Sequence, residues 1–206
     1  MKGNLIIITS PSGGGKGTLI KEILERVPNL GYSVSLTTRA PRFGEEDGRH
    51  YHFVTKEKFQ KEIDEGGFLE FAEVHGNLYG TSKAQTEKIT SEGRDVILEI
   101  DVQGAEAVMK KVPSAVSIFI LPPSFETLRA RLIARATEAT NDLDVRLKNS
   151  HYEVSRYSRF KYVVVNDDVN SAAGKLASVI VAERQLCDRQ SESIRGILDS
   201  FERSNV

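Results

Sequence analysis

A glycine-rich segment near the N-terminus has the residue types that bind a phosphate group. Residues 10–18 read Ser-Pro-Ser-Gly-Gly-Gly-Lys-Gly-Thr, directly after an apolar run and directly before a helical pattern. Glycines let successive backbone N–H groups converge on an anion, and the start of a helix adds partial positive charge. Lys16 stands where a lysine can reach the terminal phosphates of a nucleotide. The segment therefore predicts a phosphate-binding loop, with a plain glycine-rich turn as the alternative.

The loop departs at two positions from the common pattern G-x-x-x-x-G-K-[ST]. Ser10 replaces the first glycine, and Gly17 replaces the residue whose hydroxyl contacts Mg²⁺. Thr18 carries a hydroxyl one position later. We expect Mg²⁺ as the cofactor, and Thr18 as the residue that contacts it through the nucleotide.

Two carboxylates end a later apolar run. Glu99 and Asp101 are two residues apart, so alternation along a strand places both on the same side. The carboxyl end of the strands is the edge where α/β proteins bind ligands. The pair therefore fits a metal-nucleotide site, and the competing interpretation is that Asp101 only caps the next helix.

A second candidate anion site follows a pair of threonines. Arg39 and Arg42 flank a proline-stiffened turn, and Tyr51 comes after it. Two guanidinium groups can hold a phosphate through paired hydrogen bonds, while a tyrosine hydroxyl adds a donor. Surface arginines are usually only solvated, which is the alternative interpretation. Downstream, Glu70 lies in an apolar setting and Tyr79 lies between glycines.

Short β-branched runs alternate with segments of helical length, and these elements would position the residues above. The expected strands are residues 5–9, 96–100, 116–121 and 162–165. The expected helices are residues 18–26, 56–65, 103–112, 124–135, 143–157 and 171–186, with Ser124 as an N-cap. Strands that alternate with helices imply the α/β class with a parallel sheet. The other segments are an inserted α+β lobe at 33–82, a mobile polar loop at 136–142 and a charged helical tail from 187 onwards.

Length and composition exclude several classes of protein. The chain has 206 residues, 28 Lys plus Arg against 29 Asp plus Glu, and one cysteine. Its net charge of −1 argues against binding to nucleic acid or to an anionic membrane. One cysteine cannot form an internal disulfide, and no apolar run approaches the roughly 18 residues of a spanning helix. Because no signal peptide is recognisable, we expect a cytoplasmic protein.

Taken together, the motifs resemble those of the guanylate kinase family in order and spacing. Besides the loop, the block Thr-Thr-Arg-Ala-Pro-Arg at residues 37–42 is specific to this family. The other matches are Ser35, Asp47-Gly48, Tyr51, Glu70, Tyr79-Gly80-Thr81, Glu99-Ile100-Asp101 and Val165-Asn166-Asp167-Asp168. The resemblance extends over nearly the whole chain, to about Arg184.

The resemblance implies a P-loop nucleoside monophosphate kinase fold in a single domain over residues 1–206. A parallel-sheet core would comprise residues 1–34, 84–127 and 157–206, with an inserted α+β GMP-binding lobe at 35–83 and a helical lid at 128–156. The implied reaction is transfer of the γ-phosphoryl group of MgATP to GMP, and to dGMP, which gives ADP and GDP. The transfer would be in line, with charge neutralised by Lys16, Mg²⁺ and arginines.

The resemblance also implies a role for each matching residue. The GMP-binding residues would be Ser35, Arg39, Arg42, Tyr51, Glu70, Tyr79, Thr81, Glu99 and Asp101. The ATP-binding residues would be Ser12, Gly13, Gly14, Gly15, Lys16, Gly17, Thr18 and Asn166. The catalytic residues would be Lys16, Arg39, Arg131, Arg135 and Arg146. Glu70 would accept hydrogen bonds from guanine N1–H and the exocyclic amine, so adenine, which lacks the N1 donor, would be rejected.

The arginines of the second half have two interpretations. Arg131 and Arg135 are four residues apart on one helix face, which could simply be solvated. The family pattern instead makes them lid residues that, with Arg146, close over the transferred group. Ala136 stands where the family commonly has glycine.

Two other functions compete with this one. Another nucleoside monophosphate kinase would keep the loop and the lid but change the base contacts, and Glu70 and Ser35 argue against it. A non-catalytic guanylate-kinase-like module that holds a peptide would typically lose the phosphate loop, whereas Lys16 is intact. We expect ATP and GMP or dGMP as small-molecule partners, and the sequence specifies no oligomeric state.

Overall fold

The centre of the protein is a five-stranded parallel sheet. The computed structural model describes residues 2–74, 76–135 and 140–204, without the side chains of residues 135 and 140–142. The strand order is β2-β7-β1-β8-β9, and every neighbouring pair is parallel. The strands are β2 (Leu30–Tyr32), β7 (Asp95–Glu99), β1 (Leu5–Thr9), β8 (Val116–Leu121) and β9 (Tyr162–Val165). The predicted α/β class with a parallel sheet is confirmed.

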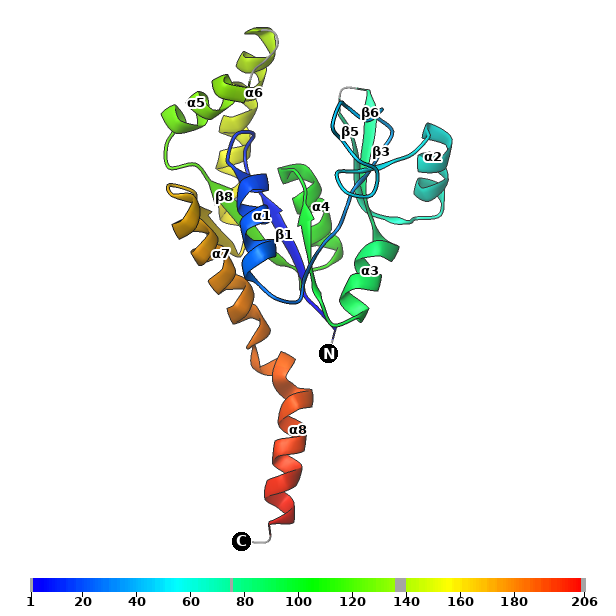
Figure 1. Cartoon of the computed structure of the whole chain (residues 1–206), viewed down its shortest axis with the longest axis vertical. Helices are drawn as coiled ribbons and strands as arrows, with labels where there is room; N and C mark the ends of the chain where they lie inside the picture. The colour runs from blue at the N-terminus through cyan, green and yellow to red at the C-terminus, as the bar shows by residue number, and fades with distance from the viewer. Residues whose placement is uncertain (1, 75, 136–139, 205–206) are drawn as a thin grey trace.

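Helices cover both faces of this sheet (Figure 1). Helices α1 (Lys16–Arg26) and α7 (Val169–Arg184) pack on one face, where Leu19 and Leu176 are fully buried. Helices α3 (Lys83–Ser91) and α4 (Val102–Lys111) pack on the other face, with Ile89 and Val108 in the second core cluster. Because both faces are covered, strands such as β1 are apolar at almost every position, as the sequence predicts.

A second sheet lies beside the first, with strand order β4-β3-β6-β5. Its strands are β4 (His52–Phe53), β3 (Leu36–Thr37), β6 (Asn77–Ser82) and β5 (Phe68–Val74). β3 pairs parallel with β4, and the other two pairs are antiparallel. Helix α2 (Lys56–Asp64) packs on this sheet through Phe59, whose ring stacks on Phe68 at 4.5 Å between centroids. The second sheet thus has its own small aromatic core.

Two helices stand over the glycine loop, and a third projects away from the body (Figure 1). The first two are α5 (Phe125–Arg135) and α6 (Thr140–Ser155), and the 3₁₀ turn Tyr157–Arg159 follows them. Ser124 accepts a hydrogen bond from Thr127 N at 3.2 Å, which confirms the predicted N-cap of α5. Helix α8 (Cys187–Arg203) extends past the end of α7, and none of its residues is buried. Within the described ranges, no helix is long and apolar enough to cross a bilayer.

The sequence-based element boundaries hold for three strands and shift elsewhere. β1, β8 and β9 coincide with their predicted ranges, whereas β7 begins and ends one residue early. The loop predicted over 136–142 is wrong at residues 140–142, which belong to α6, and residues 136–139 lie outside the described residues. Thr, Asn and Asp are common at helix starts, so the polarity of this stretch is also that of a helix N-terminus. β2 and α3 were not predicted, since β2 has three residues and α3 has few apolar ones.

Candidate active site

The conformation of the glycine loop requires glycine at several positions. Gly13 and Gly15 have φ of 81° and 87°, in the left-handed region that other residues rarely adopt. A Cβ on Gly15 would lie 2.2 Å from Asn166 Nδ2, and one on Gly14 would lie 2.7 Å from Ser10 Cβ. The run of glycines therefore lets the loop turn tightly against its neighbours, and α1 begins directly after it at Lys16.

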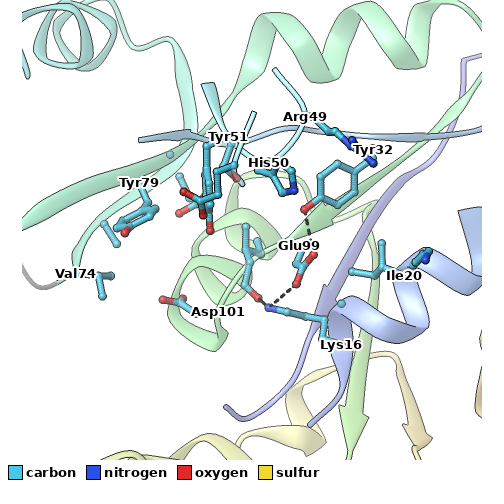
Figure 2. A pocket seen from close by; sticks show the side chains of 18 of the residues that line it. Lys16, Ile20, Tyr32, Arg49, His50, Tyr51, Val74, Tyr79, Glu99 and Asp101 are labelled. Carbon is cyan, nitrogen blue, oxygen red and sulfur yellow. Dashed lines mark hydrogen bonds and ion pairs between the residues drawn. The ribbon is translucent and has the colours of Figure 1, made fainter. Parts of the chain in front are cut away.

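Lys16 reaches from α1 to the carboxyl end of β7 (Figure 2). Its Nζ donates to Ile100 O at 2.9 Å and lies 4.0 Å from Glu99 Oε1. Burial lowers the pKa of Lys16, and the charges of Glu99 and Asp101 oppose that shift. The ammonium group thus lies at the sheet edge where the sequence predicts ligand binding, beside the predicted carboxylate pair.

A cavity of about 790 Å³ lies between the two sheets and has Lys16 in its wall. The residues that line it from the core include Lys16, Gly17, Tyr32, Glu99, Ile100 and Asp101. The residues that line it from the segment between 35 and 83 include Ser35, Glu45, Tyr51, Glu70, Tyr79 and Gly80. Figure 2 shows Tyr51 and Tyr79 on one side of this space and Lys16 on the other. The predicted phosphate-loop lysine and most of the predicted GMP-binding residues therefore meet around one cavity.

Two carboxylates approach each other across Gly104 at the base of this cavity. Asp101 Oδ1 accepts from Gly104 N at 2.7 Å, so the helix-cap interpretation of Asp101 is correct, and the residue lines the cavity as well. A Cβ on Gly104 would lie 3.0 Å from Glu70 Oε2, which shows how closely that carboxylate approaches. Glu70 is only 9% exposed, and its Oε1 accepts from Thr81 Oγ1 at 2.6 Å. Burial raises the pKa of Glu70, and the Thr81 hydrogen bond opposes that shift.

The arginine cluster is held by an acidic residue that the sequence analysis did not select. Arg39 donates to both carboxylate oxygens of Glu45, at 2.9 and 2.8 Å, and its guanidinium lies 5.4 Å from the centre of the Tyr51 ring. Arg39 lowers the pKa of Glu45 to about 2. Tyr51 packs edge-on against Tyr79 at 5.8 Å between ring centroids. Arg42 stays on the exposed loop, where its backbone N–H donates to Glu45 Oε2 at 2.7 Å.

Two further residues near Lys16 were also missed. Tyr32 donates its hydroxyl to Glu99 Oε2 at 3.0 Å, and burial raises the pKa of that tyrosine. Glu153 of α6 accepts from Ser12 N, within the glycine loop, at 3.1 Å. Glu45 could have been selected from the sequence, because it belongs to the acidic run after the two arginines. Tyr32 and Glu153 do not belong to a recognisable motif.

Arg131 and Asn166 lie against the glycine loop. Arg131 Nη2 donates to Asn166 O at 3.0 Å, and its Nη1 is 3.4 Å from Gly14 O. Asn166 Nδ2 donates to the same Gly14 oxygen at 2.9 Å. Arg146 lies half-buried on α6, and the side chain of Arg135 lies outside the described residues, as does Ala136. Of the predicted lid arginines, the structure therefore brings Arg131 to the loop.

A parallel sheet with a glycine loop and a lysine at its carboxyl edge defines a P-loop kinase fold, with the nucleotide site at the sheet edge. The comparisons with known proteins are more specific. The model of the guanylate kinase family matches residues 2–183. The chain therefore belongs to the guanylate kinase family, and the prediction of a guanylate kinase enzyme is confirmed.

Individual relatives agree with this assignment over most of their length. The guanylate kinase of Clostridium perfringens (strain SM101 / Type A) is 49% identical over 193 residues, which is 94% of this chain and 89% of that protein. The guanylate kinase of Thermotoga maritima is 45% identical over 194 residues, 94% of each chain. The crystal structure of guanylate kinase from Anaplasma phagocytophilum superposes with a TM-score of 0.75 at 35% identity, covering 91% of this chain and 89% of that one.

Proposed function

We propose that this enzyme transfers the γ-phosphoryl group of ATP, in the presence of Mg²⁺, to GMP and dGMP. The observation that carries the proposal is that Lys16 and Glu70 both line one cavity. Its volume of about 790 Å³ is in the usual range for a small-molecule site. A phosphate-loop lysine and a buried carboxylate facing one space suit a reaction that joins a nucleotide donor to a base-selected acceptor. Membership of the guanylate kinase family supports the same assignment.

The acceptor base is proposed to bind at Glu70. Thr81 holds one oxygen of this carboxylate, and its other oxygen lies near Gly104 at the cavity base. Guanine offers N1–H and an exocyclic amine to an acceptor of this kind, and Ser35 and Asp101 line the same cavity. Adenine has no N1 donor, so binding it would leave the Glu70 oxygen that Thr81 does not hold without a partner from the base.

The acceptor phosphate is proposed to bind at Arg39, Arg42, Tyr51 and Tyr79. Arg39 already faces Tyr51, which lines the cavity together with Tyr79. Two positive charges and two hydroxyl donors suit a phosphate dianion. In this arrangement the residues between 35 and 83 act as the GMP-binding lobe, and residues 1–34, 84–127 and 157–206 as the core.

The donor nucleotide is proposed to bind along the glycine loop. Ser12, Gly13, Gly14, Gly15, Lys16, Gly17 and Thr18 would surround its phosphates. Asn166 would also contribute, and within the described residues its buried Oδ1 has no hydrogen-bond partner. Arg131, Arg135 and Arg146 would contact the transferred group when residues 128–156 close as a lid.

The residues around Lys16 suit Mg²⁺. Among the residues that the structure describes, no cluster of three His, Cys, Asp or Glu side chains could hold a metal. Mg²⁺ needs no such cluster, because it usually takes one or two carboxylates plus phosphate oxygens and water. Glu99 and Asp101 supply such oxygens, and Glu99 Oε1 would lie 3.7 Å from a Cβ on Gly17, beside the position of the usual metal-contacting hydroxyl. Thr18, which is expected from the sequence to contact Mg²⁺ through the nucleotide, is exposed on the first turn of α1 and stays part of the proposed site.

The chemistry needs positioning and charge neutralisation more than a base. The attacking GMP phosphate oxygen is already largely ionised near neutral pH, because the second phosphate pKa is about 6. Bound Mg²⁺ would neutralise charge on the ATP phosphates. Lys16 and the arginines would do the same while they hold the two phosphates in line. Exclusion of water would suppress hydrolysis of ATP.

The test of this function is ADP formation from MgATP with GMP, dGMP, AMP, CMP or UMP as acceptor. We expect turnover with GMP and dGMP and little with the other three. Equal rates with AMP and GMP would remove Glu70 as the residue that selects the base. No turnover with any acceptor, from a folded chain, would favour a non-catalytic binding module, an alternative that the intact Lys16 disfavours.

A further inference from the structure

Glu153 occupies a hydrogen-bond donor of the phosphate loop. This residue lies on α6, 141 positions after Ser12, and its Oε2 accepts from Ser12 N at 3.1 Å. Ser12 is the first residue of the loop that we propose to surround the ATP phosphates. Its N–H is one of the backbone donors that a phosphate-binding loop presents to an anion. A carboxylate of the protein therefore lies where the loop would meet a nucleotide oxygen.

Glu153 lies near one positive and one negative side chain of the nucleotide site, and its pKa is raised overall. Lys16 and Asp101 both act on the Glu153 carboxylate: the lysine lowers its pKa, the aspartate raises it, and burial raises it most. The same lysine donates to Ile100 O, so Lys16 and the Ser12 N–H both have partners from the protein. A phosphate chain that enters the loop would bring more negative charge to a space that already contains a carboxylate.

Ion pairs with α4 anchor the chain directly after α6, about one helical turn from the Glu153 contact. Arg156 donates to both oxygens of Glu106 on α4, at 2.9 and 3.1 Å, and lies over the Tyr152 ring at 5.1 Å. Arg159 adds a third contact to Glu106 at 3.2 Å. These ion pairs hold the segment directly after α6 on α4, so a shift of α6 at Glu153 would leave this attachment to the core in place.

There is also space beside Glu153. A cavity of about 130 Å³ lies between the first turn of α4 and one face of α6, lined by Asp101, Val102, Gln103, Asn149, Tyr152 and Glu153. This volume holds several water molecules by the usual measure of roughly 30 Å³ each. A carboxylate displaced from Ser12 N could therefore turn into hydrated space, which avoids the cost of burying an unpaired charge.

We propose that Glu153 is a positioning residue that holds α6 on the empty phosphate loop and is displaced by the phosphates of ATP. The inference rests on the proposed function, in which this loop binds ATP. A carboxylate and a phosphate at the same N–H donor repel each other, so phosphate binding and the Glu153 contact compete. Loading of the nucleotide is thereby coupled to the position of the helix that carries Arg146.

The test compares Glu153→Gln with Asp144→Asn in the full chain. Both substitutions remove one negative charge from α6, but Asp144 is exposed and does not line either cavity described above. Binding of inorganic tripolyphosphate is measured by titration calorimetry. We expect Glu153→Gln to bind it about three- to tenfold more tightly than the wild type, because a like charge near the site is removed, and Asp144→Asn to change little. Equal affinities of the two variants would overturn the proposal.

A second readout separates positioning from a structural role. Steady-state kinetics of Glu153→Gln should show a lower KM for ATP with the KM for GMP unchanged. A loss of fold stability alone would not lower one KM selectively. Glu153→Ala, which removes the hydrogen bond as well as the charge, should bind tripolyphosphate at least as tightly as Glu153→Gln. Weaker binding by both variants would contradict displacement and make Glu153 part of the nucleotide site.

Lys16→Met distinguishes failure of this inference from failure of the proposed function. If Lys16→Met and the wild type bind tripolyphosphate equally, the loop is not the anion site and the proposed function is wrong. If Lys16→Met loses binding while Glu153→Gln matches Asp144→Asn, the loop binds the anion and only the role of Glu153 is refuted.

Discussion

Arg39 and Glu45 form a two-point ion pair at the edge of the cavity, with nitrogen–oxygen distances of 2.9 and 2.8 Å. Glu45 also accepts from Arg42 N at 2.7 Å, so one carboxylate holds both ends of the turn that carries the two arginines. A guanidinium held in this way keeps its orientation before any ligand arrives, which reduces the entropy lost on binding.

Replacing Glu45 with alanine should weaken GMP binding. Without its partner, Arg39 would lose its fixed orientation, and we expect the KM for GMP to rise about tenfold with the KM for ATP unchanged. Steady-state kinetics with each substrate varied in turn provides the measurement. Glu65→Ala is the control, because Glu65 pairs with exposed Lys61 of α2 and neither of these two residues lines the cavity. Tighter GMP binding by Glu45→Ala would show that Glu45 competes with the phosphate.

Replacing Lys16 with methionine should abolish most of the turnover while the fold persists. The ammonium group at the sheet edge is the proposed cation of the transferred phosphate, and losing it should lower kcat by about a thousandfold. Lys58→Met, on exposed α2, tests whether loss of any lysine has the same effect. Full activity of a folded Lys16→Met enzyme would remove the loop from the mechanism.

Replacing Glu70 with glutamine should reduce the preference for GMP over AMP. A glutamine of the same shape presents an amide that matches guanine N1–H and the exocyclic amine less well than a carboxylate does. We expect kcat/KM for GMP to fall about a hundredfold or more, with a much smaller change for AMP. The measurement is kcat/KM of both enzymes with GMP and with AMP as acceptor. An unchanged ratio would place base selection at other residues.

Glu70 should also make stability depend on pH. Burial raises its pKa above the ordinary 4.5, so the folded state favours the protonated carboxyl. The stabilising contribution is full below 4.5 and is lost as the pH rises through the raised pKa. Ligand-free Glu70→Gln should therefore have a higher Tm than the wild type at neutral pH, and the difference should shrink on acidification. Thermal unfolding across this range measures it, and a difference that does not vary with pH would contradict the assignment.

Replacing glycine with alanine should impair ATP binding at position 15 and stabilise the fold at position 174. Gly15→Ala places a Cβ 2.2 Å from Asn166 Nδ2 at a positive φ, so the loop must distort and the KM for ATP should rise at least about tenfold. Gly174→Ala lies within α7 with open space around its Cβ, and should stabilise the fold by about 0.5–1 kcal/mol. Denaturant unfolding and ATP kinetics of both variants provide the comparison. A neutral Gly15→Ala would show that the loop tolerates a side chain there.

The glycine loop and the strands β1, β8 and β9 could be predicted from the sequence because their signals are local. Three isoleucines at 6, 7 and 8 are fully buried in a strand covered on both faces, and such runs of apolar residues are visible without the fold. The block at residues 37–42 could be recognised from its resemblance to the guanylate kinase family.

Only the tertiary structure decided which residues meet around the site. Strand order brings β7 beside both β1 and β2, which places Tyr32 on Glu99, 67 positions away. Packing of α6 over the loop places Glu153 on Ser12, and the turn after Arg39 places Glu45 on its guanidinium. Residue types and local periodicity determine elements and motifs, whereas contacts between distant side chains depend on how those elements pack, which short-range patterns do not encode.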